Sequence, residues 1–322
     1  MKLMRLLPTK LLLLIFTFCA TALAADHGVT IVVSRIYLSA DPTSAKLGDL
    51  ERGREVAILE NSHEWLHVLA IMGPARAPEF PDDQEATHDV SGWILGKGII
   101  RASTPNGDQI LYGAAADAES EASRRGGRKG AAQDAMRLYA RAAEYFPKSP
   151  LAGEALYRAA DIRWQLDRED VMSRPSAKMK ESFLRQGMKE DAMREVIKKF
   201  PHTKWADLAA FHLIENKLCG DWQGSSQCPT KEAEFYEKYA REHAESPAAS
   251  EALYNAAWRF SALIEIYKTE NQAKRSAEAK DRAARVAQEI VSKYPQTDWA
   301  PRAQSLLYML QQGIPTYGNS TQ

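Results

Sequence analysis

The stretch Ala244-Glu-Ser-Pro-Ala-Ala-Ser-Glu-Ala-Leu-Tyr254 decides the fold of most of this chain, because its pattern occurs at three other places. The other copies begin at Pro147, Pro201 and Pro295. Each copy has a hydroxyl residue at its third place and alanine at its sixth and ninth places, and three of the four have an aromatic residue at the eleventh. Self-similarity of this kind is typical of stacked helical hairpins, which usually bind partners.

The repeated pattern places a helix start in each copy. A hydroxyl residue that can cap the second helix of a hairpin stands at the third place: Ser149, Thr203, Ser246 and Thr297. In the last copy Pro301 falls too deep in the helix for Thr297 to be the cap, so Asp298 is the alternative. The alanines form a stripe of small residues, which lets a neighbouring helix approach to about 8–10 Å. The sequence therefore predicts an all-α stack of hairpins over residues 131–312, with a tail at 313–322.

Aromatic-proline pairs mark the turn in three of the copies: Phe146-Pro147, Phe200-Pro201 and Tyr294-Pro295. His243-Ala244 replaces the pair in the remaining copy. Successive hydroxyl residues are 54, 43 and 51 residues apart, whereas a tetratricopeptide unit takes about 34. The units must therefore contain lengthened helices or insertions.

Together these features resemble tetratricopeptide repeats of the bacterial envelope kind, as in outer-membrane assembly lipoproteins and cell-division coordinators. The resemblance implies a helical-hairpin solenoid whose concave face, lined by the first helix of each pair, holds peptides or partner proteins. Candidates on that face are Arg137, Arg141, Lys189 and Tyr239. The alternative is that these side chains only keep an exposed helix surface soluble.

Residues 28–102 follow a different pattern, in which β-branched or aromatic runs alternate with glycine turns. The clearest runs are Val29–Val33, Ile36–Leu38, Glu55–Leu59, Trp65–Ile71 and Gly92–Leu95. Five short strands of this kind predict a small all-β barrel. Residues 103–130 are expected to be a connector that is partly helical, because alanine and glutamate favour helices.

The order of motifs in this region resembles a bacterial SH3-like domain. The motifs are Ile36-Tyr-Leu, Gly48-Asp-Leu, Arg52-Gly53, Trp65-Leu-His-Val and Gly92-Trp-Ile, with a longer polar stretch before Gly92 than the family usually carries. Domains of that family bind cell-wall material or proteins in an aromatic-lined groove. The resemblance therefore implies a ligand-binding role for three aromatic residues: Tyr37, Trp65 and Trp93. The alternative is that all three are structural, since aromatic side chains bury the largest areas in a small barrel.

Residues 1–24 are predicted to be a secretory signal. A basic start precedes the apolar run Leu11–Phe18, and the small residues Ala22-Leu23-Ala24 suit cleavage. The apolar run is short for a transmembrane helix, which favours a cleaved signal. An uncleaved anchor is the alternative. Lipid attachment at Cys19 is not expected, because Phe16-Thr17-Phe18 lacks the small residues of a lipobox. We therefore expect an exported, periplasmic protein with no transmembrane segment in the mature chain.

The charge of the chain is balanced, with 42 basic and 42 acidic residues. Removing Lys2, Arg5 and Lys10 with the signal leaves 39 basic residues against 42 acidic ones. A chain with this charge balance has no excess of positive charge that would indicate binding to nucleic acid or to an anionic membrane. The expected partners are envelope proteins or peptides, and peptidoglycan.

Two cysteines remain after the signal, Cys219 and Cys228, with eight turn-forming and polar residues between them. A loop this short can bring two Cα atoms within disulfide reach, and an oxidising compartment would keep the bond. We predict a disulfide, with two free thiols as the alternative. A metal site would need two further ligands from elsewhere in the chain.

One motif suggests catalysis. The residues His63-Glu64-Trp-Leu-His67 match the H-E-x-x-H pattern of zinc peptidases. That chemistry needs a helix, because two histidines one turn apart share a face and hold the metal while the glutamate activates water. On a β-strand, positions four apart are about 13 Å apart, too far to share one ion. The SH3-like pattern runs through the same residues and favours the strand.

The sequence therefore predicts a multidomain protein, with an SH3-like barrel followed by a tetratricopeptide-like solenoid. Its predicted function is that of an exported, non-enzymatic adaptor without a cofactor. Two alternatives remain: a zinc metallopeptidase that uses His63 and His67, and an assembly factor in which the barrel is only a spacer.

Overall fold

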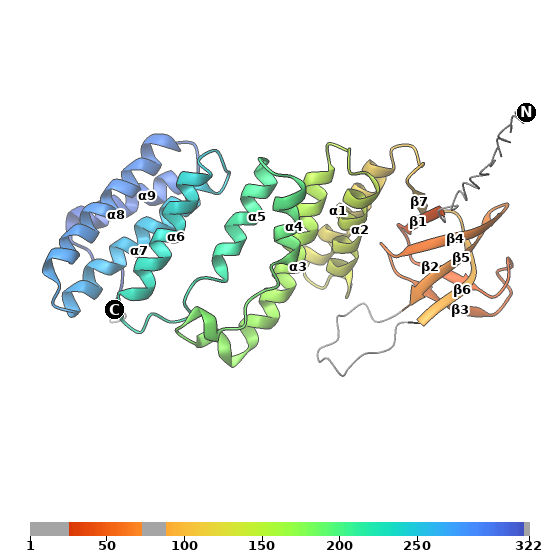
Figure 1. Ribbon diagram of the computed structural model, residues 1–322, viewed down its shortest axis with the longest axis horizontal. Coiled ribbons are helices and arrows are strands. Elements are labelled where there is room, and N and C mark those ends of the chain that lie inside the picture. Colours follow the sequence, from red (N-terminus) through yellow and green to blue (C-terminus); the bar gives the residue numbers. More distant parts are fainter. Residues whose placement is uncertain (1–25, 73–87, 319–322) are drawn as a thin grey trace, which may run out of the picture.

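The computed structural model describes residues 26–72 and 88–318. Figure 1 shows an elongated molecule with a β-sheet at one end and a row of helices leading away from it. The predicted signal at 1–24, with Cys19, lies outside the described residues. A β part followed by an α part agrees with the multidomain architecture predicted from the sequence.

The β part is one antiparallel sheet. Within the described residues its strands are β1 (Asp26–Thr30), β2 (Ser34–Tyr37), β3 (Lys46–Leu50), β4 (Glu55–Ser62), β5 (Trp65–Met72), β6 (His88–Leu95) and β7 (Ile99–Arg101). Their order in the sheet is β3-β2-β6-β5-β4-β1-β7. β1 and β2 follow each other in the chain, yet they lie at opposite ends of the run β1-β4-β5-β6-β2. Because β1 and β2 are neighbours in the chain but distant in the sheet order, the sheet must curl back so that β2 can pair with β6. The curled sheet has the shape of a small barrel.

The interior of the barrel is filled by alternate residues of its strands: Ile36, Leu50, Val56, Ile58, Leu66, Val68, Ala70, Ile94 and Ile99. Gly92 lets β2 and β6 approach each other closely. A Cβ atom at Gly92 would lie 2.5 Å from Cγ2 of Ile36 and 2.7 Å from the carbonyl oxygen of Tyr37. A larger residue would push the two strands apart, so Gly92 fixes where the barrel closes.

The α part consists of helices α1 (Gly107–Ser123), α2 (Ala131–Tyr145), α3 (Ala152–Ser173), α4 (Asp191–Lys199), α5 (Lys204–Glu215), α6 (Gln227–Glu242), α7 (Ala249–Thr269), α8 (Ala273–Lys293) and α9 (Trp299–Gln312). Four hairpins follow one another, α2–α3, α4–α5, α6–α7 and α8–α9, and each repeated stretch forms the turn inside one of them. The hairpin prediction is therefore confirmed. α1 lies in the stretch expected to be a connector, and it packs against α2 as part of the stack. No helix of the described residues is both long and apolar enough to cross a membrane.

The four hairpin turns share one backbone conformation. The residue after the first helix, which is Phe146, Phe200, His243 or Tyr294, has φ between −129° and −126° and ψ between 48° and 58°. Proline favours this departure from helical angles at the residue before it. His243 adopts the same angles although alanine follows it, so tertiary contacts must set the turn there.

The predicted helix caps are only partly correct. Thr203 caps α5, since its side chain accepts a hydrogen bond from the Ala206 N–H at 3.3 Å. Ser149 and Ser246 instead accept from the N–H two residues later, and α3 and α7 begin only three residues after them. Thr297 donates to a backbone oxygen of the preceding turn, and Asp298 holds the cap position of α9 without a side-chain cap bond. In three of the four hairpins the hydroxyl therefore closes a tight turn before the helix rather than capping it.

The barrel and the first helices share one apolar core. Val29 of β1 and Ile100 of β7 pack into a cluster with buried residues of α1, α2 and α3. The turn at Gly53, with φ of 77°, lies directly on α2, where a Cβ atom would come 2.6 Å from Cβ of Arg137. Arg137 donates from Nε to the carbonyl oxygen of Arg52 at 3.0 Å. The barrel is therefore fixed to the helical stack rather than tethered to it.

The hairpins associate in two pairs, here called the first block (α1–α5) and the second block (α6–α9). In the first block Tyr157 of α3 stacks on Trp205 of α5, with ring centroids 5.5 Å apart. In the second block Tyr254 of α7 lies on Trp299 of α9, with centroids 5.1 Å apart. In both blocks the aromatic residue at the eleventh place of one copy meets the tryptophan at the fifth place of the next.

The joint between the blocks combines apolar and polar contacts, and Ile214 of α5 is buried in the same apolar cluster as residues of α6 to α9. The Tyr239 hydroxyl donates to the carbonyl oxygen of Asp207 at 2.9 Å, and Nδ1 of His243 lies 2.7 Å from Oδ1 of Asp207. Phe211 supplies the aromatic contact of this joint. Its ring is tilted against that of Tyr239, with centroids 5.2 Å apart. Hydrogen bonds of Asp207 therefore accompany an aromatic cluster and an apolar cluster between the blocks.

Candidate binding surfaces

The aromatic residues predicted to bind a ligand lie together on the outside of the barrel. Along β5, Leu66 and Val68 point into the core, so Trp65 and His67 point outward. Tyr37 meets Trp65 edge to face, with ring centroids 5.7 Å apart.

Trp93 of β6 completes the group. It lies opposite both Tyr37 and His67 in the strand register. The His67 ring stacks on Trp93 with centroids 4.9 Å apart, and its Nε2 lies 3.0 Å from the Ser91 hydroxyl. We call Tyr37, Trp65, His67 and Trp93 the aromatic face.

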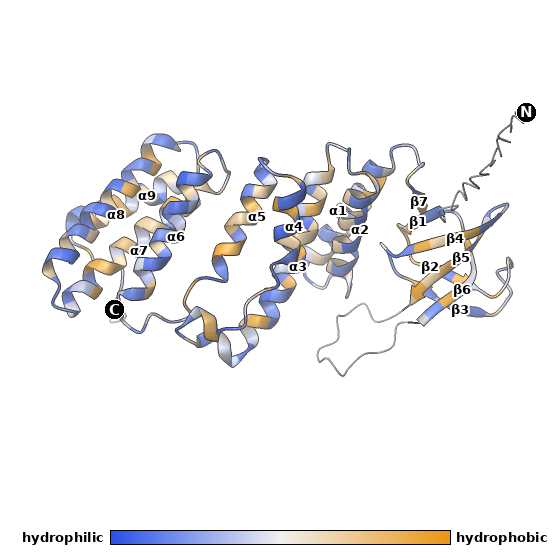
Figure 2. Ribbon diagram, viewed as in Figure 1, coloured by the Kyte–Doolittle hydropathy of each residue, from blue (hydrophilic) through white to orange (hydrophobic). Residues whose placement is uncertain are grey.

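The aromatic face continues into exposed aliphatic residues. Trp65 is covered by its neighbours and only 8% exposed, whereas Tyr37 and Trp93 are half-buried. Beyond them, exposed hydrophobic side chains continue along the outward side of β5 and β6: Leu69, Ile71 and Leu95. Figure 2 shows the hydrophobic residues on these strands in orange. A contiguous apolar patch on the outside of a small barrel is typical of a binding surface.

The H-E-x-x-H motif does not form the site that zinc-peptidase chemistry needs. His63 lies in the turn between β4 and β5 with φ of 52°, and His67 lies in β5. No helix runs through the motif, so the zinc-peptidase alternative loses its structural basis. Within the described residues, no group of three or more histidine, cysteine or acidic side chains could hold a metal ion.

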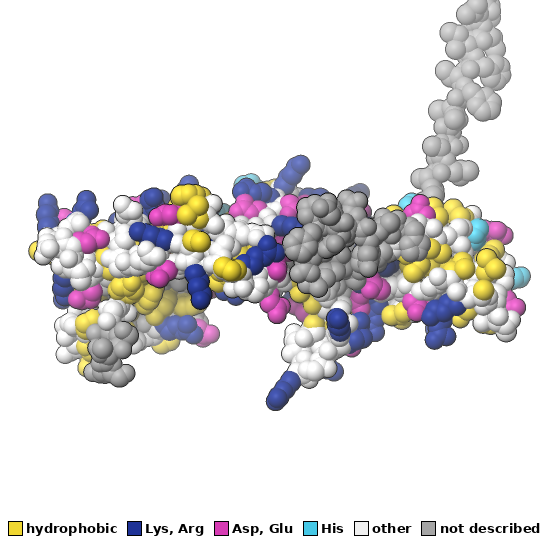
Figure 3. Space-filling model, turned by 90° about the horizontal axis from the view of Figure 1, so that it is seen from below, with side chains coloured by type: hydrophobic (Ala, Val, Ile, Leu, Met, Phe, Trp, Pro, Cys, Tyr) yellow, Lys and Arg dark blue, Asp and Glu magenta, His cyan; other side chains and the backbone are white. Residues whose placement is uncertain are grey.

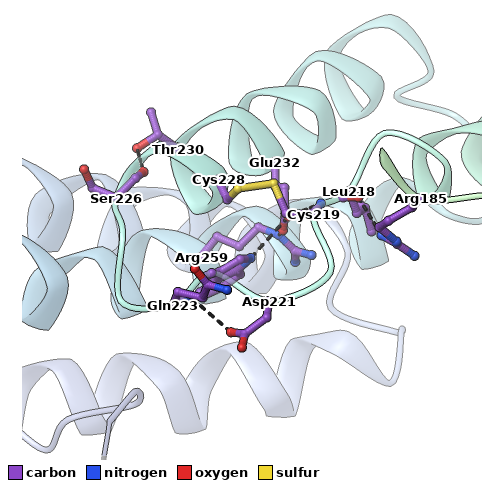
Figure 4. The surroundings of a disulfide bond; sticks show 11 residues. Arg185, Leu218, Cys219, Asp221, Gln223, Ser226, Cys228, Thr230, Glu232 and Arg259 are labelled. Atoms are coloured by element: carbon purple, nitrogen blue, oxygen red, sulfur yellow. Dashed lines mark hydrogen bonds and ion pairs between the residues drawn. A yellow bond between two sulfur atoms is a disulfide. The ribbon is translucent and has the colours of Figure 1, made fainter. Parts of the chain in front are cut away.

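The predicted disulfide between Cys219 and Cys228 is confirmed, and Figure 4 shows its surroundings. Glu232 of α6, almost completely buried, accepts a hydrogen bond from the Cys219 N–H at 2.8 Å and another from Nε1 of Trp222 at 3.2 Å. Its other oxygen accepts from Nε of Arg259 at 2.7 Å. A buried carboxylate needs such partners to offset its loss of hydration. This cluster holds the disulfide loop on α7.

Three of the four first-helix candidates are engaged by the fold. Arg137 and Arg141 of α2 bind the barrel, and Arg141 lies 3.1 Å from the Glu55 carboxylate. Tyr239 is buried and joins the two blocks. Lys189 is exposed. Arg137, Arg141 and Tyr239 therefore give no support to the expected peptide-binding role of these helices.

Buried tyrosines of the first block act as hydrogen-bond donors. Burial, and after it the hydrogen bond to Glu154, raises the pKa of Tyr112 to about 12. Burial, followed by the hydrogen bond to Glu119, also raises the pKa of Tyr139. Arg158 bridges the two carboxylates, at 2.9 Å from Glu154 and 3.1 Å from Glu119. These phenols stay protonated at neutral pH, so the network links α1, α2 and α3 and does not supply a general base.

Comparison with known proteins gives the chain no family. No family model matches its sequence, and none of the curated proteins matches it significantly. Among solved structures, similarity is found to "MamA RS-1 ArsTM double mutant", with 12% identity, coverage of 65% of this chain and 96% of that one, and a TM-score of 0.29. It is also found to the de novo designed helical repeat protein DHR64, with 17% identity, coverage of 64% and 94%, and a TM-score of 0.22. The helical-repeat architecture therefore rests on the hairpins of the chain itself.

Proposed function

We propose that this protein is an exported, non-enzymatic adaptor. Its aromatic face binds a cell-envelope ligand, either peptidoglycan or a protein segment, and its helical-hairpin stack holds a protein partner. The predicted secretory signal and the disulfide both support export to an oxidising compartment. Two binding surfaces on one chain would gain avidity when both partners belong to the same assembly.

The aromatic face is the observation that carries this proposal. The helices contact the barrel through Val29, Ile100 and the turn from Arg52 to Glu55. The aromatic face lies on β2, β5 and β6 and is not used for that contact. Aromatic rings that the fold does not need for docking its own helices offer flat surfaces for a sugar ring or a peptide. The resemblance to bacterial SH3-like domains supports the same ligand classes.

Co-sedimentation with purified peptidoglycan sacculi tests the proposal. The whole mature chain must be used, because the barrel shares its core with α1, α2 and α3. We expect the wild-type protein to be retained and Trp93→Ala to lose roughly tenfold in affinity, since one stacked aromatic contact is worth about 1–1.5 kcal/mol. Tyr308→Ala is the matched control, because Tyr308 is an exposed aromatic residue of α9 at the other end of the molecule.

Retention of Trp93→Ala at the wild-type level would contradict the role of the aromatic face. If the wild-type chain is not retained by sacculi but forms crosslinks to an envelope protein that Trp93→Ala abolishes, the ligand is a protein segment. Metal analysis covers the zinc alternative. We expect no stoichiometric zinc in the purified protein, and zinc that disappears with His63→Ala would restore that alternative.

A further inference from the structure

The segment from 174 to 189, here called the insert, joins α3 to α4. It contains two short 3-10 turns, η1 (Pro175–Lys178) and η2 (Ser182–Leu184). It lengthens the interval between Ser149 and Thr203 to 54 residues. Figure 1 shows it at the lower edge of the helical stack, below α3.

The backbone of the insert is anchored to the segment beside the disulfide. The Gly220 N–H, next to Cys219, donates to the carbonyl oxygen of Met179 at 3.2 Å. A Cβ atom at position 220 would lie 2.3 Å from that oxygen, so only glycine allows this approach. Arg185 donates from Nη1 to the carbonyl oxygen of Leu218 at 2.6 Å, as Figure 4 shows. The insert is therefore held in place by main-chain hydrogen bonds, by Arg185 and by the buried side chain of Met188 at its end.

Three hydrophobic side chains of the insert nevertheless point into solvent. Phe183 is 79% exposed, Leu184 is 56% exposed and Met179 is 48% exposed. Single exposed hydrophobic residues are common, but three within residues 179–184 concentrate apolar surface in this short part of the insert. Because the backbone beneath them is anchored, their exposure is a feature of the fold.

The insert is also strongly basic. It has one acidic residue, Glu181, against five basic ones: Arg174, Lys178, Lys180, Arg185 and Lys189. Arg174 is paired with Asp170 of α3, and Arg185 anchors the insert. No described residue forms an ion pair or hydrogen bond with the ammonium groups of Lys178, Lys180 or Lys189, although the Lys189 N–H donates to Oδ2 of Asp167 at 3.3 Å. Figure 3 views the molecule from below and shows basic, acidic and hydrophobic side chains interspersed on this side.

We propose that the insert docks the protein on an anionic phospholipid surface. Exposed aromatic and aliphatic side chains can enter the headgroup region, while lysine ammonium groups stay at the surface beside the phosphates. Each lysine near an anionic surface adds an attraction that salt screens. A protein partner fits less well, because lysine is depleted in protein–protein interfaces. The balanced charge of the whole chain predicts no such partner, but the insert concentrates its positive charge beside apolar side chains.

Vesicle co-sedimentation of the mature chain tests the proposal. The vesicles contain phosphatidylglycerol and phosphatidylethanolamine in equal parts, and phosphatidylcholine vesicles serve as the zwitterionic comparison. We expect binding to the anionic vesicles that weakens as salt is raised. The double variant Phe183→Ser with Leu184→Ser should bind at least about tenfold more weakly. Replacing Lys178, Lys180 and Lys189 by glutamine should weaken binding roughly fivefold for each lysine.

The matched control combines Tyr308→Ser with Lys274→Gln, which removes one exposed aromatic residue and one exposed lysine from the second block. This variant should bind vesicles as the wild type does. A second readout uses Ser182→Cys labelled with an environment-sensitive fluorophore, whose emission should shift to the blue on anionic vesicles. Equal binding to both vesicle types, insert variants that bind like the wild type, or an unshifted fluorophore would each overturn the proposal.

Discussion

Within each block a tyrosine ring lies against a tryptophan ring of the next hairpin, whereas the joint between the blocks combines apolar contacts of Phe211 and Ile214 with hydrogen bonds to Asp207. The tyrosine–tryptophan pairs are Tyr157–Trp205 and Tyr254–Trp299. At the corresponding place between the blocks stands Ala248, so Phe211 has no tryptophan to meet. It lies instead against aromatic residues of α6.

This difference shows that the four copies are not equivalent links of one uniform stack. Copies one and three supply the tyrosine, and copies two and four supply the tryptophan. The barrel adds to the first block through a shared apolar core. The molecule is therefore built from two units, the barrel with α1–α5 and the four helices α6–α9, joined by the apolar contacts of Phe211 and Ile214 and by hydrogen bonds to Asp207.

The largest expected effect comes from breaking the buried ion pair of the second block. Arg259→Ala leaves the almost fully buried carboxylate of Glu232 without its charged partner, which should cost about 3–5 kcal/mol. We expect the second block to unfold first in urea, giving two transitions in circular dichroism. Lys268→Ala is the control, because its exposed pair with Glu265 should contribute at most about 1 kcal/mol. A single transition that shifts as a whole would show that the two units are not separable.

The tyrosine–tryptophan joints should give the next largest effects. Tyr157→Ala and Tyr254→Ala should each cost about 2–3 kcal/mol, because each removes a large, partly buried ring from between two helices. Tyr157→Phe keeps the ring and removes only the hydroxyl that lies 3.2 Å from Nε2 of His212, so it should cost about 1 kcal/mol. Urea unfolding of the three variants gives these values. Equal losses for Tyr157→Ala and Tyr157→Phe would show that stacking is not what joins the hairpins.

A smaller effect is expected at the joint between the blocks. Tyr239→Phe removes the hydrogen bonds from its hydroxyl to Asp207 and Ser246, which should cost about 1 kcal/mol. Because the bond to Asp207 links the two units, the variant should also reduce the cooperativity between them. Calorimetry should then show a broader heat-absorption peak than that of the wild type. A peak of unchanged shape with a much lower midpoint would mean that Tyr239 is part of an ordinary core.

The smallest effect depends on pH. Burial raises the pKa of Glu251 in the first turn of α7, and His212 and Arg302 oppose the shift. A carboxyl whose pKa is raised by folding favours the folded state below its ordinary pKa, and this contribution is lost as pH rises through the raised value. Glu251→Gln, which stays neutral, should therefore raise the melting temperature at neutral pH and leave it unchanged in acid. Glu278→Gln, at an exposed site, should change neither; a lower melting temperature for Glu251→Gln at neutral pH would contradict this account.

Much of the fold could be predicted from the sequence because its signals are local. The periodic alanines gave the hairpins, and two cysteines separated by a short turn-rich loop gave the disulfide. The helix caps were predicted less well, because Ser149 and Ser246 close a tight turn whose extra residues delay the helix. The division into blocks could have been predicted from two places of the repeated stretch. Tyrosine stands at the eleventh place of copies one and three, and tryptophan stands at the fifth place of copies two and four.

Features that depend on distant segments could not be predicted. Glu232 and Arg259 look like surface charges of two helices, and only the packing of α6 on α7 buries them as a pair. The H-E-x-x-H motif makes His67 a candidate metal ligand, but its place in β5 opposite Trp93 makes it part of the aromatic face. The identification of the aromatic face as a ligand site stays a prediction.

Hydrogen exchange followed by mass spectrometry of peptic fragments tests most directly how the units are joined. Segments that open together exchange together. We predict that β1, β7 and α1–α5 lose protection as one unit and that α6–α9 lose it as another. A barrel that exchanges independently of α1–α3, or all helices exchanging as a single unit, would contradict the account.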